Sequence, residues 1–471
     1  MSRIPIILLA LVAVASAAQA SERPPNVVIV FVDDLGYGDL GCYGAPVHRT
    51  PNIDRLASEG VRFTDFYVAQ PVCSSSRAAL LTGCYPNRLG LGGVALSPGA
   101  KRGIADAERT LAELCRDHGY ATAVFGKWHL GDAAPFRPLR HGFDTWLGIP
   151  YSNDMWPGHP ETPKNWPPLP LYRDDAVVDA EVTAADQSRF TRDFTDAAVS
   201  FIEAHRASPF LVYLAHPMPH VPLYPGEAFV GHSASGTYGD VVEEIDWSVG
   251  RILATIARLG LDDDTIVMFI SDNGPWLSYG NHAGTTGPLR EGKGTTFDGG
   301  VRVPCVVRWP GGFGAGLVCH EPAMTIDILP TIAALLGDDS GPPVDGVDIR
   351  PLLTTPGATI EREALYFYYG ANRLEAVRSG RWKLHLEHTY RSMIGREPGH
   401  DGRPGQYDYG VRIGVSLFDL ASDPGEQWDL ASRRPDVVER MMRLVERARA
   451  DLGDDAVAAP GTGRREPGRI E

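Results

Sequence analysis

The sequence predicts an α/β fold in which a large, mixed but mostly parallel sheet is sandwiched by helices and followed by a smaller C-terminal antiparallel sheet with a helix. Three observations predict it. Continuous apolar runs of buried-strand type recur along most of the chain, amphipathic helical patterns separate them, and the last part changes to short strand-like segments before one helical pattern. With 471 residues, the chain is long enough to bury a large core.

Four apolar runs stop abruptly in polar, chemically capable side chains. These runs span 27–32, 121–125, 210–215 and 265–270. Their ends are followed, in order, by Asp33-Asp34, by Lys127 and His129, by His216 and His220, and by Asp272-Asn273. Helical patterns at 53–59, 111–118, 194–205 and 241–259 separate the runs. Because ligands bind beyond the carboxyl ends of parallel strands, we expect the four clusters to converge on one site.

The residue types at these strand ends fall into two chemical groups. Hard oxygen ligands, which suit Ca²⁺ or Mg²⁺ better than Zn²⁺, come from Asp33, Asp34, Asp272 and Asn273. Cations and proton carriers for an oxyanion come from Lys127, His129 and His220, to which Lys293, further along the chain, is added. An isolated Asp-Asp pair is usually a turn or a helix cap. The functional interpretation therefore depends on these acids and cations occurring together at several strand ends, and not on Asp33-Asp34 alone. For His216, Asp298 and Arg302, helix capping or sheet support is at least as good an explanation.

Between the first two clusters, small polar residues followed by good helix formers predict a helix over 74–81. Cys73 then lies at the positive end of that helix, and Arg77, one turn on, can reach the same place. A Cys before a helix is usually a buried small residue. Considered for its thiol alone, it is a candidate nucleophile, because a helix N-terminus lowers a thiol pKa. Neither interpretation explains the acids and the cations together.

The segment CSSSRAALLTG at 73–83 resembles the signature of the sulfatase family, in which a Cys and an Arg four residues later precede Leu-Thr-Gly. The chain is particularly similar to arylsulfatases of the arylsulfatase A type. Further similar segments follow in the family's order over nearly the whole chain, at 25–44, 50–67, 119–131, 141–154, 265–274, 289–304 and 417–430.

This resemblance implies a sulfuric ester hydrolase with the alkaline-phosphatase-like fold. It implies that a maturation enzyme converts Cys73 to formylglycine, whose hydrate attacks sulfur and forms a covalent sulfo-enzyme. One divalent cation, usually Ca²⁺ with Mg²⁺ as the other candidate, would be bound by Asp33, Asp34, Asp272 and Asn273, with residue 73 completing the shell. Arg77 would steady the modified side chain beside His129. Contacts with the sulfate or help to the leaving group would come from Lys127, Ser152, His220 and Lys293.

One residue departs from the family signature. Ser75 occupies the position that is usually Pro or Ala, and we expect conversion to survive because Cys73, Arg77 and Leu-Thr-Gly are intact. Two alternatives stay open: a phosphodiesterase or phosphonate monoester hydrolase of the same superfamily, and a non-catalytic binding protein with unmodified Cys73. The pocket loops, rather than these motifs, select among an aryl sulfate, a sulfated saccharide and a lipid or steroid sulfate as substrate.

The ends and the charge of the chain complete the expectations. Arg3, the apolar stretch 4–15 and the small residues before Ser21 predict a signal peptide at 1–20, and hence a periplasmic or secreted protein without a membrane span after cleavage. A net charge of -15 argues against nucleic-acid binding. We expect a catalytic domain at 21–355, an α+β subdomain at 356–456 and a flexible tail at 457–471.

Overall fold

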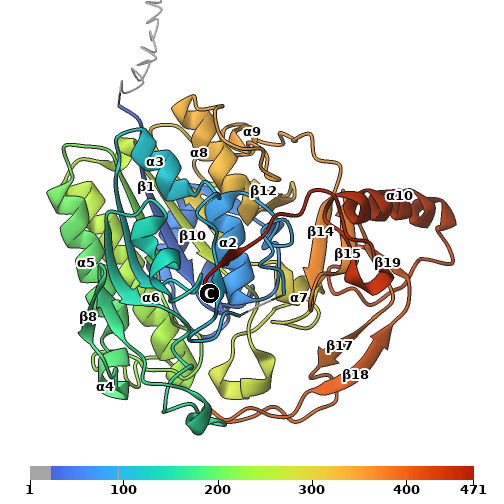
Figure 1. Ribbon diagram of the computed structural model, residues 1–471, viewed down its shortest axis with the longest axis horizontal. Coiled ribbons are helices and arrows are strands. Elements are labelled where there is room, and N and C mark those ends of the chain that lie inside the picture. Colours follow the sequence, from blue (N-terminus) through green and yellow to red (C-terminus); the bar gives the residue numbers. More distant parts are fainter. Residues whose placement is uncertain (1–22, 94) are drawn as a thin grey trace, which may run out of the picture.

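The computed structural model describes residues 23–93 and 95–471, so the signal peptide predicted at 1–20 lies outside the described residues. The chain forms a ten-stranded sheet covered by helices on both faces and, beside it, a four-stranded antiparallel sheet with a long helix (Figure 1). This architecture confirms the predicted fold class. No helix in the described part of the chain is long and apolar enough to cross a membrane.

The four predicted strands are neighbours in the large sheet. Its parallel centre consists, in spatial order, of β10 (Thr265–Ser271), β1 (Asn26–Val32), β9 (Phe210–Ala215), β5 (Ala121–Lys127) and β6 (Thr145–Ile149). Mixed edges extend it with β11 (Cys305–Arg308), β2 (Val61–Phe63) and β12 (Leu317–Cys319) on one side and with β7 (Leu171–Arg173) and β8 (Ala176–Asp179) on the other. The carboxyl ends of β10, β1, β9 and β5 therefore lie side by side.

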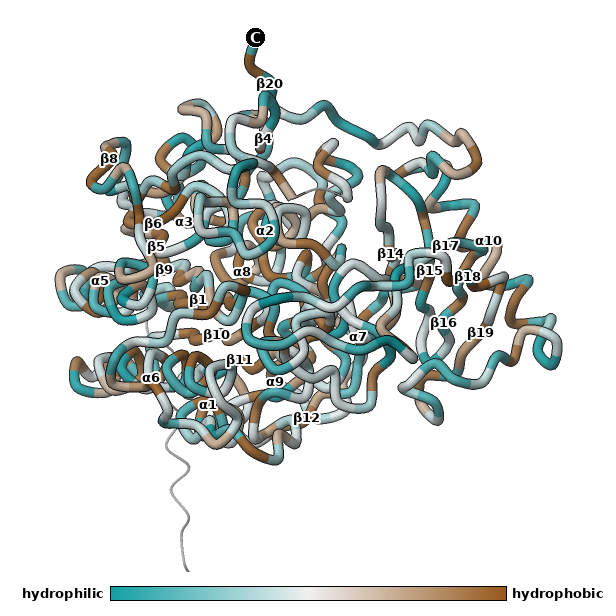
Figure 2. The backbone as a smooth tube through the Cα atoms, turned by 90° about the horizontal axis from the view of Figure 1, so that it is seen from below, coloured by the Kyte–Doolittle hydropathy of each residue, from teal (hydrophilic) through white to brown (hydrophobic). Residues whose placement is uncertain are grey.

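Strand β1 is buried on both faces, which explains its unbroken apolar sequence. Val27, Ile29 and Phe31 pack into one core cluster, and the residues between them pack into a second. The first core lies under α2 (Cys73–Thr82), α3 (Leu111–Asp117) and α8 (Ile328–Leu336). The second lies under α1 (Pro51–Ser58), α5 (Phe190–Ala204) and α6 (Gly236–Arg258). Figure 2 shows the apolar central strands between these two helical layers.

The C-terminal part packs onto the first of these cores. Its sheet has the order β14 (Leu365–Tyr369), β15 (Arg373–Ser379), β16 (Trp382–His385) and β19 (Ser416–Asp419). The helix α10 (Pro435–Asp451) contributes Val437, Met441 and Leu444 to the same hydrophobic cluster as α2 and α3. A separate hairpin consists of β17 (His388–Ser392) and β18 (Asp408–Ile413). The two parts of the chain thus share one continuous core.

Short elements complete the fold. They are β3 (Phe66–Tyr67), β4 (Arg102–Gly103), α4 (Ala184–Gln187), α7 (Asp298–Val301), β13 (Ala323–Met324), α9 (Arg350–Thr354) and β20 (Gly468–Arg469). The helix α7 begins five residues after Lys293 and β4 lies close to the strand end that carries His129, so both border the predicted site.

The tail, for which we expect a flexible segment at 457–471, makes regular contacts with the catalytic part of the chain. Strand β20 pairs antiparallel with β4, and Figure 2 shows the two side by side. The Arg465 amide donates to the Arg88 carbonyl at 2.6 Å, and the Arg465 guanidinium lies 3.0 Å from a Glu108 carboxylate oxygen. Backbone pairing and ion pairs hold this segment. A composition rich in Gly, Pro and charged residues does not predict such pairing with a distant segment.

Candidate active site

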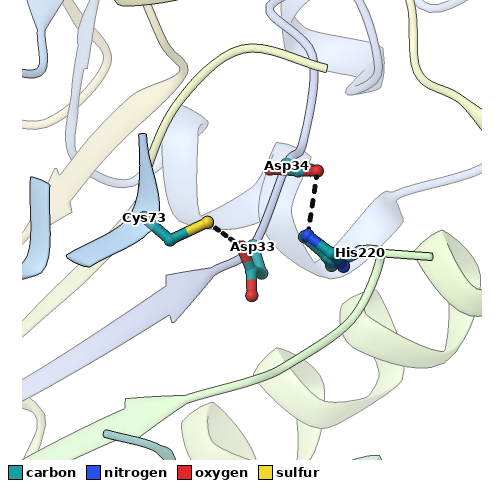
Figure 3. Close-up of side chains that lie close together, drawn as sticks. All are labelled: Asp33, Asp34, Cys73 and His220. Atoms are coloured by element: carbon teal, nitrogen blue, oxygen red, sulfur yellow. Dashed lines mark hydrogen bonds and ion pairs between the residues drawn. The ribbon is translucent and has the colours of Figure 1, made fainter. Parts of the chain in front are cut away.

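The strand ends converge as expected. Asp33 and Asp34 follow β1, Asp272 follows β10, Lys127 is the last residue of β5, and His220 lies in the segment after β9. Ligand atoms of Asp33, Asp34, His220 and Cys73 all lie within 4.8 Å of one another. Figure 3 shows the Cys73 sulfur reaching toward Asp33 while His220 faces Asp34. Residues that are far apart in the sequence therefore form one buried polar cluster.

The acidic residues interlock through their backbones and side chains. The Asp34 amide donates to Asp272 Oδ1 at 3.1 Å, and the Asp272 amide donates to the Val32 carbonyl at 2.9 Å. Asn273 Nδ2 donates to Asp34 Oδ1 at 2.7 Å. Asp34 has φ 65, an uncommon conformation for a residue other than Gly that is concentrated at functional sites. These contacts keep the ends of β1 and β10 in register at the site.

Cys73 is the first residue of α2 and is 2% exposed. Its Sγ lies 3.5 Å from Asp33 Oδ1. Burial, together with the nearby Asp33 carboxylate, raises the pKa of the Cys73 thiol far above its ordinary value. The unmodified thiol is therefore a poor nucleophile, in contrast to the activated thiolate that a helix N-terminus alone would favour.

Two buried cations hold the Asp33 side of the cluster. Arg77 Nη2 donates to Asp272 Oδ2 at 3.0 Å, and its Nη1 donates to the Lys127 carbonyl at 3.0 Å. Lys127 Nζ forms an ion pair with Asp33 and donates to Ser152 Oγ at 3.1 Å. Burial acts to raise the pKa of Asp33, but the surrounding positive charges outweigh it and hold that pKa well below its ordinary value. Asp33 is therefore a carboxylate.

On the Asp34 side, Lys293 Nζ lies 2.7 Å from Asp34 Oδ1 and 4.7 Å from the centroid of the Trp276 ring. His220 packs edge-on against the same ring, with centroids 5.6 Å apart. Its Nδ1 donates to the Val221 carbonyl at 2.6 Å, and its Nε2 lies 3.6 Å from Asp34 Oδ2. Trp276 thus forms a wall against which Lys293 and His220 both rest.

His129 is buried with φ 63, and its Nε2 donates to the Leu96 carbonyl at 3.0 Å. Because a carbonyl only accepts, this contact places the ring proton on Nε2. The pKa of His129 is well below its ordinary value, because burial and the positive charges of Lys127 and Arg77 disfavour the imidazolium. Nδ1 is buried and has no hydrogen-bond partner within the described residues. The ring is thus neutral, with a free acceptor.

The donor set fits a hard divalent cation. Asn273 Oδ1 is buried without a hydrogen-bond partner among the residues that the structure describes. It lies in the same interlocked cluster as the carboxylates of Asp33, Asp34 and Asp272. An orphaned amide oxygen beside several carboxylates is the oxygen-rich environment that Ca²⁺ and Mg²⁺ prefer.

The structure also contains site residues that the sequence analysis missed. Trp276 lies three residues beyond Asn273. Its position shortly after the end of a strand could have identified it from the sequence as a candidate site residue. Leu96 acts through its backbone carbonyl, which no side-chain motif reveals. Conversely, His216 lies away from this cluster and contacts Ser248 of α6 at 3.0 Å. Asp298 and Arg302 bond to each other and to the surrounding core, in agreement with the structural role considered for them.

Comparisons with known proteins give a consistent result. A family model described as sulfatase matches residues 25–338, and one described as the C-terminal region of aryl-sulfatase matches residues 361–461. Arylsulfatase A of Bos taurus is 40% identical over 458 residues, which cover 91% of this chain and 88% of the relative. N-acetylgalactosamine-6-sulfatase of Mus musculus is 38% identical over 468 residues, with 93% and 88% covered. The crystal structure of PsFucS1 sulfatase from Pseudoalteromonas sp. superposes with a TM-score of 0.81 at 28% identity, covering 93% of this chain and 92% of that one.

The buried His216 predicts a specific loss of stability in acid. Burial lowers the pKa of His216 to about 3, whereas an unfolded His titrates near 6.5. Below about pH 6.5 the unfolded chain therefore binds a proton that the native state does not, and stability falls as the pH drops toward 3. Between pH 7 and pH 5 this effect lowers the free energy of unfolding by about 2 kcal/mol. We expect His216→Gln to abolish that part of the pH dependence, because the amide does not titrate and can still bond Ser248.

Urea unfolding at the two pH values measures this difference. Exposed His400 provides the matched control, because His400→Gln leaves the pH dependence of the wild type unchanged. An identical pH dependence of wild type and His216→Gln would contradict a buried neutral imidazole.

Proposed function

Because this chain belongs to the sulfatase family and is a sulfatase, we propose that it hydrolyses sulfate monoesters at the cluster around Cys73, with residue 73 converted to formylglycine. The observation that carries the proposal is the position of Cys73. It is buried at the start of α2, with Sγ 3.5 Å from Asp33 Oδ1, in a cluster that also contains Arg77 and Lys127. The raised pKa of the thiol disfavours the thiolate that would have to attack an ester, which supports a modified nucleophile at this position.

Formylglycine and a divalent cation have defined chemistry at such a site. Formylglycine, as a hydrated aldehyde, supplies two hydroxyls on one carbon, one to attack sulfur and one whose loss of a proton can release sulfate. A divalent cation, which Asp33, Asp34, Asp272 and Asn273 would bind, supplies Lewis-acid stabilisation of negative oxygen. The chain itself contributes the groups that bind the sulfate and move the protons.

Sulfate binding falls to the cations and neutral donors that border the carboxylates. Lys127 already donates to Ser152 Oγ, and Lys293 and His220 stand against Trp276. Together these groups offer the donors that the non-bridging oxygens of a sulfate ester require. Because all of them are buried, their attraction for an anion is little screened by water.

Two imidazoles supply proton transfer. His129 is neutral and its Nδ1 is free to accept the proton of a residue 73 hydroxyl. Because His220 Nδ1 donates to the Val221 carbonyl, the ring can protonate the leaving oxygen of the substrate only through Nε2, and only when it is the imidazolium. Lys293 Nζ, 2.7 Å from Asp34, is the other group that can protonate the leaving oxygen. We propose that Arg77 holds residue 73 in place from the Asp272 side.

The remaining sequence expectations belong to the same proposal. The catalytic residues come from 21–355, whereas 356–456 form a C-terminal subdomain that packs against them. Export to the periplasm or the medium rests on residues 1–20, and conversion of Cys73 requires a maturation enzyme that reads 73–83 in extended form. Ser75 does not disturb the folded site, because its hydroxyl donates to the Leu91 carbonyl at 2.7 Å. Aryl sulfates and sulfated saccharides are the proposed substrates.

Mass spectrometry of the tryptic peptide 63–77 tests the nucleophile directly. We expect protein made through its native export pathway to yield a peptide lighter than the Cys form by about the mass of one water molecule, because the thiol becomes an aldehyde. The same peptide should react with a hydrazide, and a Cys73→Ala variant should yield neither signal. A peptide that carries only the unmodified thiol, from every preparation, would refute the formylglycine mechanism.

Metal binding predicts a second measurable effect. Ca²⁺ added to chelator-treated protein should raise the thermal unfolding temperature. At a Ca²⁺ concentration about a hundred times Kd, binding should increase the free energy of unfolding by about 2.7 kcal/mol. Asp34→Asn removes a carboxylate of the cluster and should weaken Ca²⁺ binding at least about tenfold, whereas Asp106→Asn, at an exposed site, should not. Equal unfolding temperatures with chelator and with Ca²⁺ would contradict the metal site.

Matched aryl esters distinguish sulfate hydrolysis from the phosphonate and phosphodiester alternative. A sulfate monoester presents three non-bridging oxygens, but a phosphodiester or a phosphonate monoester presents two and would leave a buried donor unpaired. We therefore expect kcat/KM for an aryl sulfate to exceed that for the corresponding phosphorus esters by about tenfold or more. The reverse order would assign the site to phosphorus chemistry.

A further inference from the structure

We propose that Arg391, on strand β17 of the C-terminal part, is a positioning residue that fixes Lys293 and thereby shapes the sulfate pocket. The functional importance of Lys293 rests on the proposed function. The contact between Arg391 and Lys293 does not, and it can be tested separately.

Arg391 contacts Lys293 in two ways. Its Nε donates to the Lys293 carbonyl at 2.9 Å, and its Nη2 donates to the same oxygen. Its guanidinium also lies 5.9 Å from the centroid of the Trp276 ring. The ammonium of Lys293 lies over that same ring, 4.7 Å from its centroid. Arg391 therefore holds the backbone of Lys293 and supports the aromatic ring on which its side chain rests.

The turn that carries Lys293 is one that needs support. Glu291 has φ 57, which is uncommon for a residue with a side chain, and Gly294 has φ 76. A Cβ at position 294 would lie only 2.5 Å from Arg391 Nη2, so the close approach of Arg391 and the positive φ both favour Gly there. The neighbour of Arg391 on β17, Ser392, donates to Glu291 Oε1 at 2.6 Å. Two consecutive residues of β17 thus hold both ends of the turn.

The same turn connects to the rest of the active site. The Lys293 amide donates to the Pro275 carbonyl at 3.0 Å, next to Trp276. The Gly294 amide donates to the Pro71 carbonyl at 3.0 Å, two residues before Cys73. Backbone bonds from the segment after β10 and from the segment before α2 therefore meet the Arg391 side chain of β17 at Lys293 and Gly294. Movement of this turn would displace the ammonium relative to residue 73.

Such a displacement matters because a lysine side chain is long and flexible. Its ammonium is a point charge on a stem of four carbons, so its position depends on a fixed backbone and a fixed wall. A shift of about 1 Å in a group that positions substrate can reduce the rate about a hundredfold. Arg391 suits the positioning role because its planar fork gives two parallel donors to one carbonyl while its face packs on aromatic rings, including Tyr407 at 4.7 Å.

Hydrogen exchange tests the positioning without reference to activity. In Arg391→Ala we expect the amides of Lys293 and Gly294 to exchange at least about tenfold faster than in the wild type, because the Lys293 carbonyl loses its bonds to Arg391. Arg391→Lys keeps one donor and should fall between the two. The control is Arg396→Ala on the same hairpin, where the exposed arginine pairs with Asp408 at 2.6 Å and contacts neither Lys293 nor Trp276. Unchanged exchange at 293–294 in Arg391→Ala would overturn the proposal.

A double-mutant cycle tests whether this positioning acts through Lys293. The measured quantity is the affinity for inorganic sulfate, by calorimetry, in wild type, Arg391→Ala, Lys293→Ala and the double variant. We expect Arg391→Ala to weaken sulfate binding about tenfold in the wild-type background and less than about twofold when Lys293 is absent. Equal effects in both backgrounds would overturn the proposal, because Arg391 would then act independently of Lys293. Failure of the proposed function would appear differently, as wild-type protein that binds sulfate but does not turn over aryl sulfates.

Discussion

Three acidic side chains are buried at one edge of this sheet, and three buried cations lie against them. Asp33 pairs with Lys127 and Arg77, Asp34 with Lys293, and Asp272 with Arg77. An uncompensated buried carboxylate would cost several kcal/mol, so each cation must arrive in the correct place. The cations come from β5, α2 and the turn before α7, and this requirement explains why those elements are held so firmly.

The same charges serve stability in the free protein and chemistry in the reaction. Under the proposed function, a divalent ion bound by the carboxylates would leave the ammonium groups of Lys127 and Lys293 to bind an anion, while Arg77 would hold residue 73. The imidazoles follow from the same environment, because positive neighbours and burial keep His129 neutral. A neutral ring with an unpaired Nδ1 is what a proton acceptor needs. The electrostatic balance of the cluster and its proposed catalytic roles therefore have one physical origin.

The C-terminal part contributes to this balance from a distance. Lys383 of β16 lies 2.7 Å from Asp298 and 3.0 Å from Glu426, and a Glu426 oxygen accepts from the Asp298 amide at 2.6 Å. All three side chains are buried, so the beginning of α7 is bound to the C-terminal sheet by charges that water does not screen. The helix α7 starts just after the turn that carries Lys293. The ion pairs of Lys383 therefore attach the end of this segment to the C-terminal sheet, and Arg391 attaches its beginning. The C-terminal sheet is thus part of the structure that supports the active site.

Local patterns in the sequence determined the central strands, the helix that begins at Cys73 and the polar residues that end each strand. These features depend on neighbours along the chain: the unbroken apolar run of β1 requires burial on both faces, and adjacent parallel strands bring their ends together. The family resemblance rested on the same local segments. For this reason the fold class and the convergence of the acids and cations could be predicted from the sequence alone.

Tertiary packing set the features that depend on contacts between distant segments. The helix N-terminus alone suggests a lowered thiol pKa for Cys73, but burial beside Asp33 raises it. Arg391 reaches Lys293 across 98 positions in the sequence, and the tail pairs with β4 although its composition suggested a loose end. Desolvation, charge compensation and backbone pairing between remote segments are set by how the chain packs, and no local pattern records them.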